Sequence, residues 1–320
     1  MIENLKKIEL HLHLDGSVRV STIEELLDKN DLEKELVVDE NTKSLTDYLK
    51  KFDLPIKVMQ SKENLIRISK ELCEDLIKDN VIYAEIRFAP NFHTKEGLSL
   101  DEVVSSVLLG LDSKNIKTNL ILCMMRGDSY ENNKNIIDLA IKYRNKGVCG
   151  IDLAGDEAKY PTSLYKDLFS YALENNLNIT VHAGEAGTSK EVKDAISYGA
   201  KRIGHGIKII NDEEAIKLVK EKQIPLEICP TSNVQTCNVD NIMNHPIKKL
   251  FDKGILVTIN TDNRTVSNTS LNKEYKLLEE YLNFTKEDFI KTSLIAIDKA
   301  FLTNEEKQEL RKIINKNTKS

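Results

Sequence analysis

The stretch "IELHLHLDGS" (residues 8–17) alternates apolar and polar side chains along its length. Strict alternation predicts a β-strand, because successive side chains of a strand point to opposite faces. His11 and His13 therefore share one face, and the leucines between them share the other. Two ring nitrogens at this spacing can bind one metal ion, although two hydrogen-bonded histidines on a half-buried strand would show the same pattern. The rest of the chain has to distinguish these interpretations.

Seven further short apolar runs, rich in β-branched residues, follow this one. The eight runs cover residues 8–14, 81–89, 118–125, 147–155, 178–185, 202–206, 224–232 and 255–262. Amphipathic segments typical of helices lie between them, and this repetition predicts parallel strands joined by helical crossovers. Eight such strands predict an α/β fold of the (β/α)₈ TIM-barrel type.

The interval between the first two predicted strands, residues 16–80, is too long for a single crossover. We expect a helical insertion there, opening with a capping-box pattern from Ser21 to Glu24 and including a helix around residues 45–60. Extra C-terminal helices are predicted over residues 271–316. Because the chain has no linker rich in Pro, Gly or Ser, we expect a single domain over residues 1–320.

Composition excludes several classes of function. The chain has 320 residues, a net charge of −5 and no basic stripe, so nucleic acid and anionic membranes are not expected as partners. There is no phosphate-binding loop of the G-x-x-x-x-G-K-[ST] type. The five cysteines are odd in number and form no C-x-x-C pair, which indicates reduced thiols. Without a secretory signal or a long apolar run, the protein is expected to be cytoplasmic.

Polar residues gather where the predicted strands end, and active sites of (β/α)₈ barrels lie at these carboxyl ends. Four of the six histidines are there, together with an aspartate at the end of the eighth run. We predict that one metal ion is bound by His11, His13, His182 and Asp262. Three imidazoles and one carboxylate suit Zn²⁺ best, with Fe²⁺ and Mn²⁺ as alternatives.

Two more side chains are expected beside the metal. Glu185 lies three residues beyond His182 and can transfer a proton to the substrate without binding the metal. His205, between two glycines, is expected to act as a second base or to orient a water molecule activated by the metal. His93 and His245 lie in loop-like segments, and no function is predicted for them.

Five motifs in order carry a family resemblance: "HLHLDGS", "DLAGDE", "HAGE", "GHG" and "NTDN", at residues 11–17, 152–157, 182–185, 204–206 and 260–263. The set resembles the adenosine deaminase branch of the metal-dependent amidohydrolase superfamily, and it extends from the first strand to the eighth. The resemblance implies hydrolytic deamination of adenosine and 2′-deoxyadenosine to inosine and 2′-deoxyinosine, with release of ammonia and one Zn²⁺ per chain.

The resemblance also implies a role for each matching residue in catalysis. The metal ligands would be the four residues predicted above. Glu185 would donate a proton to purine N1, which makes C6 more electrophilic. His205 and Asp262 would position the zinc-activated water that attacks C6.

Other matching residues would bind the substrate. Gly155 would donate its backbone N–H to purine N3, Asp15 would accept from the ribose 5′-hydroxyl, and His13 would line the sugar pocket. Asn263 stands where many relatives have a second aspartate, and its amide can donate to purine N7 at any pH. The segment around Leu49 and Phe52 resembles a hydrophobic gate, although an ordinary amphipathic helix would show the same pattern.

Other functions remain as alternatives. A deaminase of the same branch could act on adenine, AMP or an N6-modified AMP, but Asp15 would repel a 5′-phosphate. Adenine-specific relatives tend to carry Glu at this position. A phosphotriesterase-like hydrolase would need a bridging lysine, and a cytidine-type deaminase would need H-x-E with P-C-x-x-C. A non-catalytic barrel would be expected to lack a ligand or the acid. The expected partner is therefore a small purine nucleoside; the oligomeric state is open.

Overall fold

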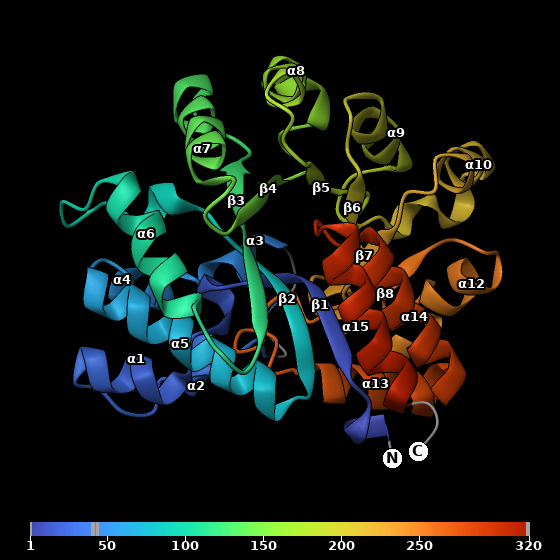
Figure 1. Ribbon diagram of the computed structural model, residues 1–320, viewed down its shortest axis with the longest axis horizontal. Coiled ribbons are helices and arrows are strands. Elements are labelled where there is room, and N and C mark those ends of the chain that lie inside the picture. Colours follow the sequence, from blue (N-terminus) through green and yellow to red (C-terminus); the bar gives the residue numbers. More distant parts are fainter. Residues whose placement is uncertain (1, 40–41, 43–44, 318–320) are drawn as a thin grey trace.

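The computed structural model describes residues 2–39, 42 and 45–317 (Figure 1). Each of the eight predicted runs overlaps one strand, and the first and third strands begin one residue before their runs. The strands are β1 (Lys7–His13), β2 (Val81–Phe88), β3 (Lys117–Met125), β4 (Val148–Ala154), β5 (Thr180–Ala183), β6 (Arg202–His205), β7 (Leu226–Ile228) and β8 (Val257–Ile259). The prediction of eight strands is confirmed.

The strands pair in parallel in two sets, β1-β2-β3-β4 and β5-β6-β7-β8. Two single bridges join the sets into a closed cylinder, Ile151 with Ile179 and Leu12 with Asp262. At the second bridge, His13 N donates to Asp262 O over 2.7 Å, and Asp262 N donates to His11 O over 2.9 Å. The (β/α)₈ barrel is thus confirmed, and its closing seam runs through three of the predicted metal ligands.

Helices surround this cylinder, as Figure 1 shows for the green to orange part of the chain. They are α6 (Leu100–Leu111), α7 (Tyr130–Tyr143), α8 (Lys166–Glu174), α9 (Ser189–Ser197), α10 (Glu213–Glu221) and α12 (Ile247–Asp252). Each buries one apolar face; α10, for example, buries Ala215, Ile216 and Val219. Polar side chains cap the starts of α6, α7, α9 and α10, and the cap of α6 is a capping box between Ser99 and Glu102.

The predicted insertion between β1 and β2 is helical. It contains α1 (Val20–Leu27), α2 (Glu33–Leu36), α3 (Leu45–Lys50), α4 (Asp53–Val58) and α5 (Lys62–Lys78). The helix expected around residues 45–60 is thus two short helices, α3 and α4. The capping box from Ser21 to Glu24 is wrong, because α1 begins at Val20 and has no side-chain cap. Instead, Arg19 at the helix start pairs with Asp75 of α5 over 2.7 Å, a tertiary contact that local sequence does not reveal.

The predicted C-terminal helices are also present, as α13 (Leu271–Leu282), α14 (Lys286–Lys299) and α15 (Asn304–Asn317). Helix α14 packs across β8 and β1. There Ile8 and Leu10, on the outer face of β1, pack against Ala296 and Ile297. This packing covers the seam of the barrel and so supports the strand that carries both histidines. No helix of the described residues is long and apolar enough to cross a membrane.

Candidate active site

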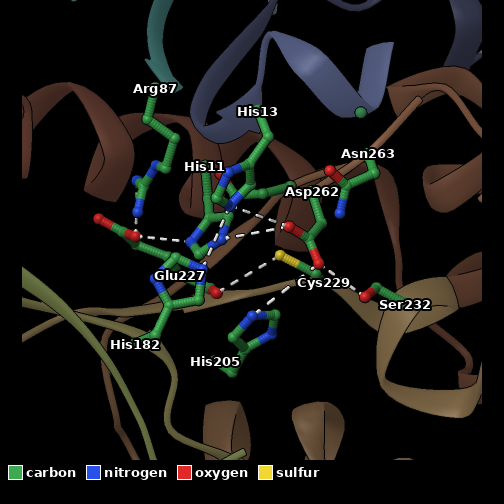
Figure 2. Close-up of polar contacts among 12 residues, drawn as sticks. His11, His13, Arg87, His182, His205, Glu227, Cys229, Ser232, Asp262 and Asn263 are labelled. Carbon is green, nitrogen blue, oxygen red and sulfur yellow. Dashed lines mark hydrogen bonds and ion pairs between the residues drawn. The ribbon is translucent and has the colours of Figure 1, made fainter. Parts of the chain in front are cut away.

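Four side chains from β1, β5 and the end of β8 converge at the mouth of the barrel. His11, His13, His182 and Asp262 each offer one ligand atom, and these atoms lie within 4.8 Å of one another. His13 Nε2 is 3.2 Å from His182 Nε2, and His11 Nε2 is 3.4 Å from Asp262 Oδ1. Figure 2 shows the three rings turned toward the Asp262 carboxylate. The four residues predicted from the sequence to bind a metal ion therefore lie close together.

The donor set fits a zinc ion. His11 Nε2 is buried and has no hydrogen-bond partner among the described residues, as a nitrogen reserved for a metal would be. Burial holds the pKa of His13 well below its usual range, so its ring is neutral and can donate a lone pair. Burial alone would raise the pKa of Asp262, but the neighbouring His11 ring, 3.4 Å away, keeps that pKa well below the usual range. Three imidazoles with one carboxylate are ligands that Zn²⁺ accepts.

A second group with metal-ligating geometry overlaps the first. It combines His11 and Asp262 with His205 and Cys229. Burial raises the pKa of the Cys229 thiol well above its usual range, so sulfur is held in the protonated form that binds metals poorly. The group of three histidines and Asp262 therefore fits the ion better.

Carboxylates behind the cluster orient its rings. Glu227 Oε2 of β7 lies 2.8 Å from His11 Nδ1, and Asp152 Oδ2 of β4 lies 2.8 Å from His182 Nδ1. Both contacts leave Nε2 of each ring directed to the centre of the cluster. Carboxylates placed behind metal-binding histidines in this way set the orientation and basicity of the rings.

Arg87 of β2 joins these two carboxylates. Its guanidinium donates to Asp152 Oδ2 over 3.0 Å and to Glu227 Oε2 over 2.9 Å (Figure 2). All three side chains are fully buried, and Glu227 also accepts from Arg202 Nε over 2.6 Å. The interior of the barrel beneath the cluster is thus a network of paired charges. Removing one member would leave another charge buried and unpaired.

The sequence alone predicts no role for Arg87, Asp152 or Glu227. A signal is present, since Arg87 and Glu85 interrupt the mainly apolar strand "VIYAEIRF", and Glu227 lies between two apolar residues in "LEI". A charged residue at an inward strand position needs a partner in the barrel interior. Which partner it finds depends on strands that are far apart in sequence.

Glu185 and His205 lie side by side next to the metal cluster. Glu185 Oε2 is 3.4 Å from His205 Nε2, and Glu185 Oε1 accepts from Asn233 Nδ2 and Thr236 Oγ1 over 3.3 and 3.2 Å. Burial, together with the charge of Asp262, raises the pKa of Glu185 to about 8. A carboxyl group with this pKa holds a proton at neutral pH and can donate it.

The loop that carries Glu185 is fixed by Glu157. The Glu157 carboxylate accepts backbone N–H groups from Gly184, Glu185 and Ala186. Glu157 is the last residue of the "DLAGDE" motif, and the sequence alone predicts no role for it. Its position means that this motif holds the "HAGE" loop in place as well as lining the cavity.

Two of the site residues adopt a left-handed backbone. His205 and Asp262 both have φ of 63°. This conformation costs free energy for residues other than glycine and is concentrated at functional sites. Ser232 Oγ donates to Asp262 Oδ2 over 2.6 Å, which holds the carboxylate in this orientation (Figure 2).

A cavity of about 370 Å³ opens above the cluster. Its lining includes every predicted substrate-binding residue and both gate residues: His13, Asp15, Leu49, Phe52, Gly155 and Asn263. A groove of about 950 Å³ at the opposite ends of the strands, lined in part by Lys201 and Phe301, is larger. None of the predicted site residues lines that groove, so the smaller cavity is the candidate active site.

The substrate-side residues are held by specific contacts. Burial raises the pKa of Asp15 to about 6. Gly155 has φ of 102°, a conformation that favours glycine. Asn263 Nδ2 donates to Tyr48 Oη over 2.9 Å, whereas its buried Oδ1 has no partner among the described residues. A Cβ on Gly16 would lie only 1.8 Å from that oxygen, so Gly16 leaves the room that Asn263 occupies.

Comparison with known proteins agrees with this geometry. The family model described as adenosine deaminase matches residues 6–317. An adenosine deaminase from Clostridium acetobutylicum is 45% identical, over 97% of this chain and 97% of its own. Arabidopsis ADAL complexed with GMP is 32% identical with a TM-score of 0.90, and the match covers 99% of this chain and 98% of that one. The Arabidopsis N6-mAMP deaminase MAPDA is 33% identical with a TM-score of 0.89, covering 98% and 99%. The chain belongs to the adenosine deaminase family.

Proposed function

We propose that this chain is a zinc-dependent aminohydrolase that converts adenosine and 2′-deoxyadenosine to inosine and 2′-deoxyinosine, with release of ammonia. The observation that carries the proposal is the convergence of His11, His13, His182 and Asp262 beside the protonated acid Glu185, directly beneath one cavity. The name of the Clostridium acetobutylicum relative supports the choice of substrate.

The four converging residues would hold one Zn²⁺. A zinc ion in this position lowers the pKa of a bound water molecule toward neutrality. The remaining chemistry belongs to side chains of the protein. Glu185 holds a proton and would donate it to purine N1, which draws electrons from C6. His205 and Asp262, whose Nε2 and Oδ2 atoms are 3.9 Å apart, would orient the attacking water between them.

The cavity would bind the nucleoside through groups on opposite walls. Asn263 would donate to purine N7 through the amide hydrogen that Tyr48 does not use. Gly155 would donate to N3, Asp15 would accept from the 5′-hydroxyl, and His13 would line the sugar pocket. Leu49 and Phe52 would cover the apolar face of the base and exclude water. Exclusion of water strengthens each of these polar contacts.

A nucleotide substrate is the second candidate. Lys95 lines the same cavity and could pair with a phosphate. Arabidopsis ADAL was solved with GMP, and a second relative is an N6-mAMP deaminase. Two carboxylates, Asp15 and Asp53, also line this cavity, and they would repel a 5′-phosphate more than one lysine attracts it. The nucleoside is therefore the preferred substrate.

The proposal includes a single domain over residues 1–320 and a cytoplasmic location. The support comes from the sequence: no linker rich in Pro, Gly or Ser divides the chain, and its five cysteines form no C-x-x-C pair.

A direct assay can test the proposed function. Purified protein is mixed with adenosine, 2′-deoxyadenosine, adenine, AMP or N6-methyl-AMP, and the loss of absorbance near the adenine band is followed with and without a chelator. We expect turnover of the two nucleosides, abolished by the chelator and restored by Zn²⁺. Turnover of AMP or adenine in preference to adenosine would contradict the choice of substrate.

A further inference from the structure

Asn233, in the short helix α11 (Pro230–Gln235), connects three groups that no motif links. Its Oδ1 lies 3.2 Å from His245 Nε2. Its Nδ2 lies 3.0 Å from His205 Nδ1 and 3.3 Å from Glu185 Oε1. Asn233 is fully buried and His245 is 2% exposed. One side-chain amide therefore contacts both proposed proton-handling groups, and a buried histidine contacts that amide from behind.

His245 determines which way the amide faces. Burial lowers the pKa of His245 to about 3, so the ring is neutral at pH 7 and carries one N–H. The backbone N–H of Ile247 donates to His245 Nδ1 over 3.1 Å, so Nδ1 is the acceptor. The proton is then on Nε2, which donates to Asn233 Oδ1.

The same reasoning extends to His205. Because Asn233 Oδ1 accepts from His245, the NH₂ group of Asn233 must face His205 and Glu185. One N–H is available for His205 Nδ1 and the other for Glu185 Oε1. A neutral imidazole that accepts at Nδ1 carries its proton on Nε2. That nitrogen faces Glu185 Oε2 at 3.4 Å and Asp262 Oδ2 at 3.9 Å.

We propose that Asn233 and His245 are positioning residues that hold His205 in the tautomer protonated at Nε2. The hydrogen-bond chain from Ile247 N–H through His245 and Asn233 makes His205 a hydrogen-bond donor toward the reacting atoms. Of the two roles expected for His205, second base or orienter of the water, this tautomer supports the orienter, because Nε2 has no free lone pair to take a proton. The catalytic consequence rests on the proposed function, whereas the tautomer itself does not.

Nuclear magnetic resonance of the zinc-loaded protein, labelled with ¹⁵N in its histidine rings, reads the tautomer directly. A His205→Gln variant assigns the His205 signals. We expect the wild type to show Nδ1 without a proton and Nε2 with one. Asn233→Asp keeps the shape of the side chain but gives Nδ1 an acceptor, so the proton of His205 should move to Nδ1.

The kinetic effect of Asn233→Asp should fall on kcat. A histidine held in the wrong tautomer lowers kcat by as much as about 10⁴-fold in serine proteases. We expect kcat to fall by at least about 10²-fold here. The fall should be smaller than in serine proteases, because His205 would orient the water rather than accept its proton. KM for adenosine and the zinc content should stay within about two-fold of the wild type, because Asn233 is neither a proposed zinc ligand nor a predicted substrate-binding residue.

Matched variants separate the tautomer from the cost of burying a carboxylate. Asn133 is also fully buried, and its amide bonds the backbone of Met125. Asn133→Asp should destabilise the fold without changing the His205 signals. His245→Gln keeps an N–H donor and should preserve the wild-type tautomer, whereas His245→Leu should give mixed tautomers and a lower kcat. The His245 pair decides the question even if Asn233→Asp does not fold.

Two results would overturn this proposal. One is a wild-type His205 that carries its proton on Nδ1. The other is a wild-type tautomer that persists in His245→Leu, or in a folded Asn233→Asp protein. A wild-type enzyme with the Nε2–H tautomer but without turnover of any purine would instead contradict the proposed function alone.

Discussion

Arg87 is the group whose removal should weaken metal binding without touching a ligand. Its guanidinium joins Asp152 and Glu227, and these carboxylates contact His182 and His11 over 2.8 Å each. Arg87→Met retains about the same side-chain length and removes these two hydrogen bonds, together with a third from Arg87 to Leu10 O of β1. Two fully buried carboxylates then lose a shared cation.

The size of the effect follows from the partners that remain. Glu227 keeps Arg202 at 2.6 Å, whereas Asp152 retains only His182 and the weak donor Cys123 Sγ at 3.7 Å among its described polar contacts. Breaking a buried pair costs about 3–5 kcal/mol. Loss of the groups that orient a metal-binding histidine lowers metal affinity by about 10–100-fold. Because Asp152 is the less supported carboxylate, His182 should be the ligand that loses its orientation.

Zinc affinity is measured by competition with a chromophoric chelator, and stability by urea unfolding of the metal-free and zinc-loaded forms. Arg67→Met is the matched control, because Arg67 is 35% exposed and pairs with Glu25 on the surface. A surface pair of this kind contributes about 0–1 kcal/mol, so this control should bind zinc normally. A folded Arg87→Met protein with wild-type zinc affinity would refute the role assigned to the carboxylates.

Three further predictions concern the cavity and the core. Asn263→Leu should lower kcat/KM by about 10²-fold, the value of a lost buried hydrogen bond to the base, with zinc retained; full activity would contradict its contact with N7. Phe52→Ala should raise KM for adenosine several-fold with little change in zinc content if Phe52 covers the base, and an unchanged KM would favour an ordinary packing helix. Burial raises the pKa of Glu274 from 4.5 to about 7, so the folded state binds this proton more tightly than the unfolded state. The resulting contribution to the free energy of unfolding is fully present below pH 4.5 and is lost as pH rises through about 7. Glu274→Gln should therefore be most stabilising, relative to the wild type, at pH 8 rather than pH 5 in urea unfolding; an equal effect at both pH values would be evidence against that protonation.

The fold could be predicted from the sequence because its signals are local. Alternation along β1 and short β-branched runs mark the strands, and amphipathic periodicity marks the helices between them. The start of α1 could not be predicted, since the ion pair of Arg19 with Asp75 connects residues 56 positions apart. Long-range contacts of this kind outweigh a local capping pattern.

The candidate site was predictable to the extent that its residues lie at strand ends. His11, His13, His182 and Asp262 could be selected because a barrel brings all such ends to one face. The residues behind them could not be paired from sequence, because Arg87 and Glu227 are 140 positions apart.

Asn233 and His245 illustrate a second limit. The sequence around a histidine in a loop-like segment does not reveal which residues it contacts, so no function is predicted for His245. Its contact with Asn233, which in turn contacts His205 and Glu185, exists only because α11 and the segment after it fold over the same strand ends. Hydrogen-bond direction, rather than residue type, gives this histidine its proposed role.

The central claim is that one zinc ion is held by three histidines and an aspartate at the mouth of the barrel. Anomalous diffraction at the zinc edge, from crystals of active enzyme, tests it most directly. The account predicts a single strong peak bonded to His11, His13, His182 and Asp262. A peak on the overlapping group that includes His205 and Cys229, or fully active crystals without any metal peak, would contradict it.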